Sequence, residues 1–183
     1  MTERELIEGC VSNKQAAQKE LFSLYAGKMM SVCLRYANDE GQAQDILQEG
    51  FIRVFKKIGQ YRHEGSFEGW LRRVFASVAI RQITKQKIHF SSVDIADSKE
   101  HSVDETALAK ISADEIHAMI RRMPDGYRTV FNLNIIEGYS HEEIAVMLGV
   151  QPTTSRGQLL KARKYLQAMI GKKYNIIKNT NNV

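Results

Sequence analysis

The sequence has few of the residues that break helices or cross-link chains. Only two prolines and two cysteines occur among 183 residues, and no apolar run approaches the length that a membrane crossing needs. Stretches that strictly alternate apolar and polar residues are also absent. These absences argue against a β-sheet protein, a disulfide-stapled secreted domain and a membrane-inserted protein. Helix-forming residues dominate what remains, so we expect an all-α fold.

Patterns typical of a catalytic or metal centre are missing as well. Cys10 and Cys33 belong to no Cys-x-x-Cys motif, so we expect buried or free thiols in a reducing compartment. The histidines show no ligand spacing with cysteines or paired carboxylates; they are His63, His89, His101, His117 and His141. We therefore expect no cofactor, no metal and no enzymatic activity. The polar N-terminus is unlike a signal peptide, which predicts a cytoplasmic protein.

Charge is distributed unevenly along the chain. The overall net charge is +5, made up of about +4 over residues 1–90, −5 over 91–118 and +6 over 119–183. Two basic ends predict two separate contacts with a polyanion such as nucleic acid. Residues 90–103 have little periodicity and many turn-forming residues, which is typical of a linker between two helical domains.

The segment 138–166, GYSHEEIAVMLGVQPTTSRGQLLKARKYL, predicts two helices joined by a tight turn. Ser140 and Glu143 form a capping box at the start of the first helix. Gly149 is placed to end it in a left-handed conformation, and Pro152 suits the first turn of the second helix. The layout is that of a helix-turn-helix, whose second helix lies in the major groove of DNA.

The predicted second helix has two distinct faces. One face is apolar or small, with Ser155, Leu159, Ala162 and Leu166. The opposite face carries Thr153, Arg156, Gly157, Leu160, Lys161 and Lys164. Such a basic face is often only solvated, but Leu160 among the cations favours DNA, because an apolar side chain can contact a thymine methyl group.

In the N-terminal half, residues 16–37 predict a helix with an apolar stripe that includes Leu24, and residues 42–58 predict an amphipathic helix. Ile52 falls on the polar half of the second helix, beside Asp45, Gln48 and Glu49. A single exposed apolar residue can be interpreted in two ways: as an ordinary surface residue, or as the anchor of a partner-binding face.

The next stretch combines aromatic residues with cations. Residues 61–70, YRHEGSFEGW, lead into an expected helix at 71–88, on which Arg73, Ser77, Thr84 and Lys87 share one face. Rings for bases and cations for phosphates suit single-stranded nucleic acid. The alternative is that Phe67 and Trp70 close the core over the neighbouring glycines.

Taken in order, these pieces resemble the sigma-70 family of RNA polymerase initiation factors, in particular its extracytoplasmic-function (ECF) group. The matching segments are 45–58, 66–71 with the basic helix up to Lys87, 123–131, 137–150 and 153–166. The resemblance implies two small helical domains joined by a flexible linker: sigma region two at 1–89, a linker at 90–106, sigma region four with the helix-turn-helix at 107–174, and a frayed tail at 175–183.

The resemblance also implies binding roles for named residues. Core polymerase, through the clamp coiled coil of its largest subunit, would be bound by Asp45, Gln48, Glu49 and Ile52. The melted minus-ten element would be bound by Ser66, Phe67, Trp70, Arg73, Ser77 and Lys87. The minus-thirty-five duplex would be bound by Thr153, Thr154, Arg156, Leu160, Lys161, Arg163 and Lys164. Further implied partners are the polymerase flap and an anti-sigma factor.

The chain departs from the family pattern on the basic helix. Ser77, Arg81 and Thr84 stand where Asn, Asp and Arg are common, so the sequence does not predict the minus-ten bases. Two other functions account for less of the sequence. A helix-turn-helix regulator with an all-α sensor domain explains the C-terminal half alone, and a nucleic-acid enzyme lacks clustered acidic ligands or a nucleophile–base motif.

Overall fold

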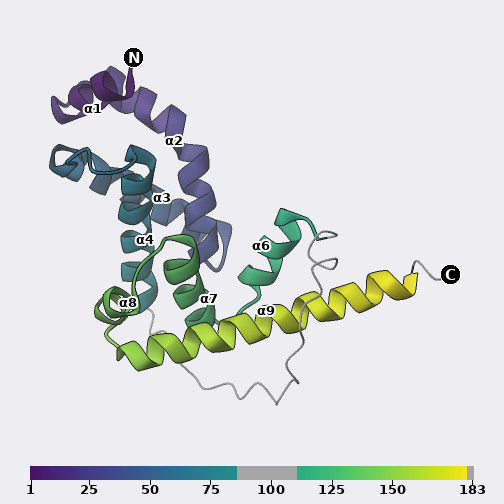
Figure 1. Cartoon of the computed structure of the whole chain (residues 1–183). Helices are drawn as coiled ribbons and strands as arrows, with labels where there is room; N and C mark the ends of the chain where they lie inside the picture. Colours follow the sequence, from purple (N-terminus) through teal and green to yellow (C-terminus); the bar gives the residue numbers. More distant parts are fainter. Residues whose placement is uncertain (86–110, 181–183) are drawn as a thin grey trace. The chain divides into compact units, whose positions relative to one another are not determined.

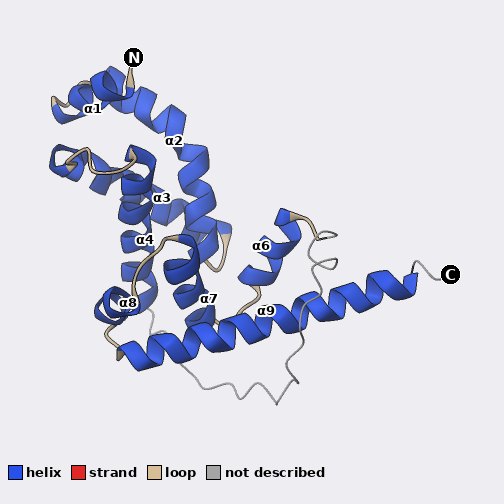
Figure 2. Cartoon of the chain, viewed as in Figure 1, coloured by secondary structure: helices blue, strands red, loops and turns tan. Residues whose placement is uncertain are grey.

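The computed structural model describes residues 1–85 and 111–180, with side chains for 1–84 and 111–173. These residues form helices joined by short turns, with no strand among them (Figure 2). The chain divides into two compact units, Met1–Lys87 and Ile88–Val183. The prediction of two helical domains in an all-α fold is therefore confirmed. The predicted linker at 90–106 lies outside the described residues.

The first unit is built on three helices that pack pairwise around one core (Figure 1). They are α2 (Gln15–Tyr36), α3 (Glu40–Lys57) and α4 (Phe67–Lys85), and a short 3₁₀ helix η1 (Ile58–Gln60) follows α3. The N-terminal helix α1 (Glu3–Val11) packs on α2 and η1. The core includes Leu21, Met29, Cys33, Ile46, Val54, Leu71 and Phe75, none more than 1% exposed. Burial of these apolar side chains drives the assembly of the unit.

A glycine allows α3 and α4 to approach closely. A Cβ atom added at Gly50 would overlap the ring of Phe75, which is fully buried. The same ring makes an edge contact with Phe51, with ring centroids 5.2 Å apart. Gly50 therefore fixes the depth at which the two helices pack, and so the position of the polar face of α3.

The second unit surrounds the long helix α9 (Pro152–Thr180). The helices α6 (Ala113–Arg121), α7 (Asp125–Phe131) and α8 (His141–Leu148) all pack on α9, and a π-helical turn η2 (Asn132–Ile136) extends α7 (Figure 1). Toward its C-terminal part, α9 forms a small core with α6 through Met119, Ile170 and Ile111. An ion pair between Glu115 and Lys173 lies beside it.

The predicted geometry of the helix-turn-helix is confirmed in detail. Ser140 and Glu143 form the reciprocal capping box at the start of α8. Gly149 ends α8 with φ +67°, a left-handed conformation in which a side chain would be strained. Pro152 is the first residue of α9. Local chemistry alone decides these features, which is why the sequence could predict them.

One predicted face assignment and two predicted helix boundaries need correction. Leu24, predicted to lie on the apolar stripe of α2, is 56% exposed. The helix expected from residue 71 begins at Phe67, because Ser66 Oγ accepts a hydrogen bond from the Gly69 amide (3.1 Å) and caps the helix. The tail expected to fray from 175 remains helical to Thr180, and no proline or glycine occurs between 172 and 180 to stop it. Across the described ranges, no helix is both long and apolar enough to cross a membrane.

Candidate nucleic-acid and protein interfaces

The outer face of α3 presents the residues predicted to bind a protein partner. Asp45, Gln48, Glu49 and Ile52 are all exposed, and the Ile52 side chain retains 41% of its accessible surface. The inner face of the helix holds them in place, because Ile46 and Val54 are fully buried. An apolar side chain thus stands in the solvent among carboxylates and amides, as the helical periodicity predicted.

The apolar surface next to this helix is larger than the sequence indicated. Phe22 of α2 lies against Phe51, with ring centroids 4.7 Å apart, yet it remains 47% exposed. Phe55 of α3 is half-buried and lies 6.1 Å from the Phe51 ring. Sequence reasoning missed Phe22 because it falls outside the regular stripe of α2.

An aromatic cluster marks the start of α4. Tyr61 lies 5.2 Å from the Phe67 ring and 5.7 Å from the Trp70 ring, measured between centroids. Phe67 and Trp70 are stacked at 5.7 Å, and Tyr25 of α2 meets the edge of Phe67 at 5.7 Å. Tyr61 also donates a hydrogen bond from its hydroxyl group to the Gly65 carbonyl (2.8 Å). The cluster therefore supports the loop that precedes α4.

The members of this cluster differ in their access to solvent. Phe67 is 0% exposed, so its predicted contact with DNA is corrected: its ring fills the core and has no face to offer a base. Trp70 and Tyr61 are only half-buried. Tyr61 was not among the predicted site residues, and its half-exposed ring beside Trp70 adds a second aromatic surface.

The polar side of α4 carries the remaining predicted minus-ten residues. Arg73 and Ser77 are exposed, as is Ser66 at the helix start. Thr84 is half-buried and donates its hydroxyl proton to the Ile80 carbonyl (2.5 Å). Lys87 lies outside the described residues.

Glu68 connects the start of α4 to α2. Its carboxylate accepts hydrogen bonds from Lys28 (2.6 Å) and Arg72 (2.8 Å). These hydrogen bonds, first that from Lys28 and then that from Arg72, lower the pKa of Glu68 below its ordinary value of 4.5. The carboxylate thus orients the first turn of α4, on which Trp70 lies.

The two faces of α9 are segregated as predicted. Ser155, Leu159 and Ala162 are buried against the rest of the unit. The outward residues Thr153, Arg156, Gly157, Leu160, Arg163 and Lys164 are exposed, whereas Thr154 and Lys161 are half-buried. Leu160 keeps 57% of its surface accessible although it is apolar.

Two side-chain contacts join the start of α8 to the start of α9. His141 Nδ1 lies 2.9 Å from the hydroxyl oxygen of Ser155, which is fully buried. The next residue on each helix forms an ion pair, in which Arg156 Nη2 donates to Glu142 Oε1 at 2.6 Å. Sequence reasoning assigned no role to Glu142, which lies in the first turn of α8. Its pairing with a residue fourteen positions later depends on how the helices cross.

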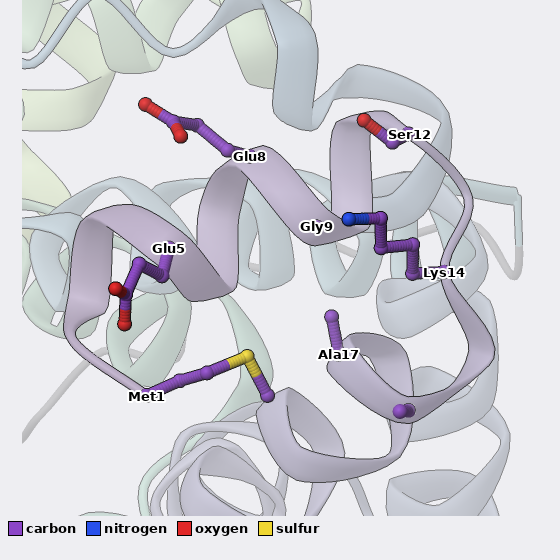
Figure 3. Close-up of a pocket in the computed structure, with 8 residues that line it drawn as sticks. Met1, Glu5, Glu8, Gly9, Ser12, Lys14 and Ala17 are labelled. Atoms are coloured by element: carbon purple, nitrogen blue, oxygen red, sulfur yellow. The ribbon is translucent and has the colours of Figure 1, made fainter.

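The first unit also has an open hollow at the corner between α1 and α2 (Figure 3). It measures about 360 Å³, and Glu5, Glu8, Lys14 and Ala17 are among its lining residues. None of the predicted site residues lines it. Within the part of the chain that the structure describes, His, Cys, Asp and Glu side chains form no cluster able to hold a metal ion.

Comparison with known protein families identifies the family of the chain that carries these faces. Residues 21–88 match the family described as "Sigma-70 region 2", and residues 113–166 match "Sigma-70, region 4". The chain belongs to the sigma-70 family. The first match covers the α3 and α4 faces of this sigma factor, and the second covers the helix-turn-helix.

Curated relatives cover almost the same length as this sigma factor. It is 27% identical to the RNA polymerase sigma-H factor of Pseudomonas aeruginosa over 180 residues, which are 90% of this chain and 93% of the relative. It is 26% identical to the ECF RNA polymerase sigma-E factor of Haemophilus influenzae, covering 93% of this chain and 96% of the relative. Within the family, the chain is therefore an ECF sigma factor.

Solved structures support the same fold. The sigma factor RpoE of Bartonella quintana, solved with the anti-sigma factor NepR, aligns with a TM-score of 0.52 at 15% identity, covering 84% of this chain and 96% of that one. CnrH, solved with the cytosolic domain of CnrY, aligns with a TM-score of 0.50 at 19% identity and covers 93% and 97%. As a sigma factor, the chain is a transcription initiation factor that gives RNA polymerase its promoter specificity.

Proposed function

We propose that this sigma factor joins RNA polymerase core to a two-part promoter through three separate helix faces. The α3 face binds the polymerase, the start and polar side of α4 hold the melted minus-ten strand, and the outward face of α9 binds the minus-thirty-five duplex. The observation that carries the proposal is the α9 face, where exposed cations and Leu160 lie opposite a buried stripe in a helix-turn-helix.

The α9 face has the chemistry that duplex recognition requires. The Arg156 guanidinium group can donate two parallel hydrogen bonds to a guanine edge, and Leu160 offers an apolar contact for a thymine methyl group. Arg163 and Lys164 are exposed cations further along the helix, suited to phosphate contacts that position the protein. Lys161 is half-buried, and because a lysine can bury its stem while its ammonium group stays in water, it can contribute to the same phosphate contacts.

The α4 region has the chemistry for single-stranded DNA. Trp70 and Tyr61 offer half-exposed rings on which bases can stack, and Arg73 supplies positive charge. No chemical step is needed, because strand opening draws on the binding energy of the captured bases. Nucleotidyl transfer belongs to the polymerase, so this chain is proposed to have no catalytic residue of its own.

The α3 face supports polymerase binding through an apolar anchor with a polar rim. Ile52 stands among Asp45, Gln48 and Glu49, an arrangement that fits a coiled-coil partner with both apolar and cationic side chains. We propose the clamp coiled coil of the largest subunit as that partner, with the flap as a contact of the second unit. Because its polymerase and promoter lie there, we also propose a cytoplasmic location.

An anti-sigma factor is a further proposed partner. The Bartonella relative of similar fold was solved with one. The α3 face, with exposed Ile52 and the nearby Phe22, is the surface that such an inhibitor would need to cover in order to block the polymerase.

Run-off transcription with purified core polymerase tests the proposal. Promoters selected from genomic DNA should be transcribed only when this chain is present. Ile52→Asp should weaken core binding by about 2 kcal/mol or more, roughly thirtyfold, because it places a charge at the centre of the contact. Leu24→Asp is the matched control, since Leu24 is also exposed in the first unit but lies on α2.

Two outcomes would refute the assignment of these faces. Equal core affinity of Ile52→Asp and Leu24→Asp would remove the α3 face from the polymerase contact. Tight binding to a palindromic site as a dimer, with no dependence on polymerase, would instead identify a conventional helix-turn-helix regulator.

A further inference from the structure

The contacts that join α8 to α9 lie at the edge of the face proposed to bind duplex DNA. His141 meets Ser155, which is fully buried, and this contact ties the start of α8 to the inner side of α9. One residue further on each helix, Glu142 and Arg156 meet on the outer side, where their side chains remain 64% and 54% exposed. A carboxylate therefore lies beside the cation that is best placed to read a base.

This ion pair adds little to the stability of the free protein. Exposed ion pairs gain little net free energy, because water screens the charges and the side chains lose freedom. Its effect lies instead in the conformation of Arg156. One terminal nitrogen of the guanidinium group is held by Glu142 at 2.6 Å, which restricts the side chain and leaves its other N–H groups available.

The carboxylate also changes what Arg156 can bind. A guanidinium group free of partners donates readily to any phosphate, and such contacts carry no sequence information. A carboxylate beside Arg156 repels phosphate and neutralises part of the cation's charge. It leaves attraction to a base edge that presents acceptors at the right place, because those hydrogen bonds depend on geometry as well as on charge.

We propose that Glu142 is a positioning residue for sequence discrimination: it aims Arg156 at a base edge and lowers affinity for DNA in general. The proposal rests on the proposed function of α9 as the duplex reader. It adds that an acidic residue outside the recognition helix contributes to specificity by weakening non-specific binding.

The experiment measures affinity for two duplexes of equal length. One carries the upstream element selected with the wild-type holoenzyme, and the other is a scrambled sequence. Dissociation constants are measured for holoenzymes that contain wild type, Glu142→Gln, Arg156→Ala and the double variant, at several salt concentrations. Asp114→Asn is the matched control, because it removes another exposed first-turn carboxylate, on α6.

Glu142→Gln should tighten binding to the scrambled duplex and reduce the ratio of selected to scrambled affinity by about three- to tenfold, a part of what one base contact supplies. Its salt dependence on scrambled DNA should steepen by about one phosphate contact. In the Arg156→Ala background the same change should leave the ratio unaltered, since there is no guanidinium group left to position. Asp114→Asn should leave the ratio at the wild-type value.

The comparison of single and double variants distinguishes a failure of the positioning role of Glu142 from a failure of the duplex face itself. If Arg156→Ala lowers the ratio but Glu142→Gln does not, the positioning role is overturned while the duplex face stands. If Glu142→Gln lowers the ratio equally in both backgrounds, Glu142 contacts DNA itself and the inference is overturned. If Arg156→Ala leaves both duplex affinities unchanged, the duplex face fails and the inference fails with it. Equal thermal midpoints for all variants would show that none of these effects comes from unfolding.

Discussion

Gly157 lies inside α9, on the exposed face that we assign to duplex DNA. A Cβ atom added there would meet no atom within 4 Å beyond its chain neighbours and the backbone of its own helix. Glycine within a helix costs about 1 kcal/mol relative to alanine, so the free protein gains nothing from its presence at this position. The lack of a side chain here, on the side of the face next to Leu160 and Lys161, would, however, let the helix backbone approach DNA closely.

Gly157→Ala should therefore have effects of opposite sign on folding and on binding. The free energy of unfolding should rise by about 0.5–1 kcal/mol, because alanine favours the helix. Affinity for the upstream duplex should fall by about 1–3 kcal/mol, the usual effect of an extra methyl group in a packed contact. Denaturant unfolding and duplex titration measure the two quantities. A variant that is more stable and binds duplex as well as wild type would show that DNA does not approach this part of α9.

At the scale of helices, the packing of α3 on α4 depends on Gly50. Gly50→Ala should lower the free energy of unfolding by about 1–3 kcal/mol, because the added methyl group would force the buried Phe75 ring to move. Gly27→Ala is the matched control within α2, where an added Cβ atom meets nothing within 4 Å. It should stabilise by about 0.5–1 kcal/mol. If both variants changed the free energy of unfolding by the same amount, helix propensity alone, and not packing against Phe75, would explain the effect of Gly50→Ala.

The stability of the start of α4 should depend on pH, because the Glu68 carboxylate titrates. Its pKa is lowered in the folded state, so its contribution is fully present above its ordinary value of 4.5 and is lost as the pH falls through the lowered pKa. Glu68→Gln should reduce stability near pH 7 by about 0.2–1 kcal/mol, the range for solvent-screened pairs. The difference in thermal midpoint between variant and wild type should shrink as the pH is lowered below 4.5.

Glu64→Gln provides the comparison for that experiment, because it removes an exposed carboxylate four residues earlier without breaking the Lys28 and Arg72 contacts. A gap between Glu68→Gln and wild type that stays constant down to pH 3 would contradict the assigned linkage.

Local signals in the sequence predicted the helix-turn-helix well. The capping box at Ser140, the left-handed Gly149 and the position of Pro152 each depend on a few adjacent residues, and all three are found. The exposure of Ile52 and Leu160 followed from helical periodicity alone. These features need no knowledge of which helices meet.

Features that depend on tertiary contacts were not predictable in this way. Phe67 was assigned to DNA but is a core residue, because Tyr25 and Tyr61 close over it from other segments. The pairing of Glu142 with Arg156 requires the crossing of α8 and α9. The π-helical turn after α7 was not predicted from the sequence, and there the Asn134 side chain donates to the Tyr139 carbonyl (2.9 Å).

At the scale of the whole molecule, both cysteines of the chain belong to the first unit. Cys10 and Cys33 are free thiols with 1% and 0% exposure, and burial raises the pKa of the Cys33 thiol to about 12. Because the thiolate is the reactive form, both should resist a disulfide reagent such as DTNB at neutral pH in the native protein. Both should react at once in denaturant. Rapid labelling of Cys33 under native conditions would contradict its burial.

Those two buried thiols make the opening of the first unit measurable by chemical labelling. A reagent can reach them only when that unit opens, so the labelling rate reports how often it opens, while the second unit, which has no cysteine, leaves no trace in the signal. Mass spectrometry of the labelled chain could follow this rate in the free sigma factor, in holoenzyme and in an anti-sigma complex. A partner that binds and stabilises the first unit would lower the labelling rate. A partner that binds only the second unit would leave the labelling rate unchanged.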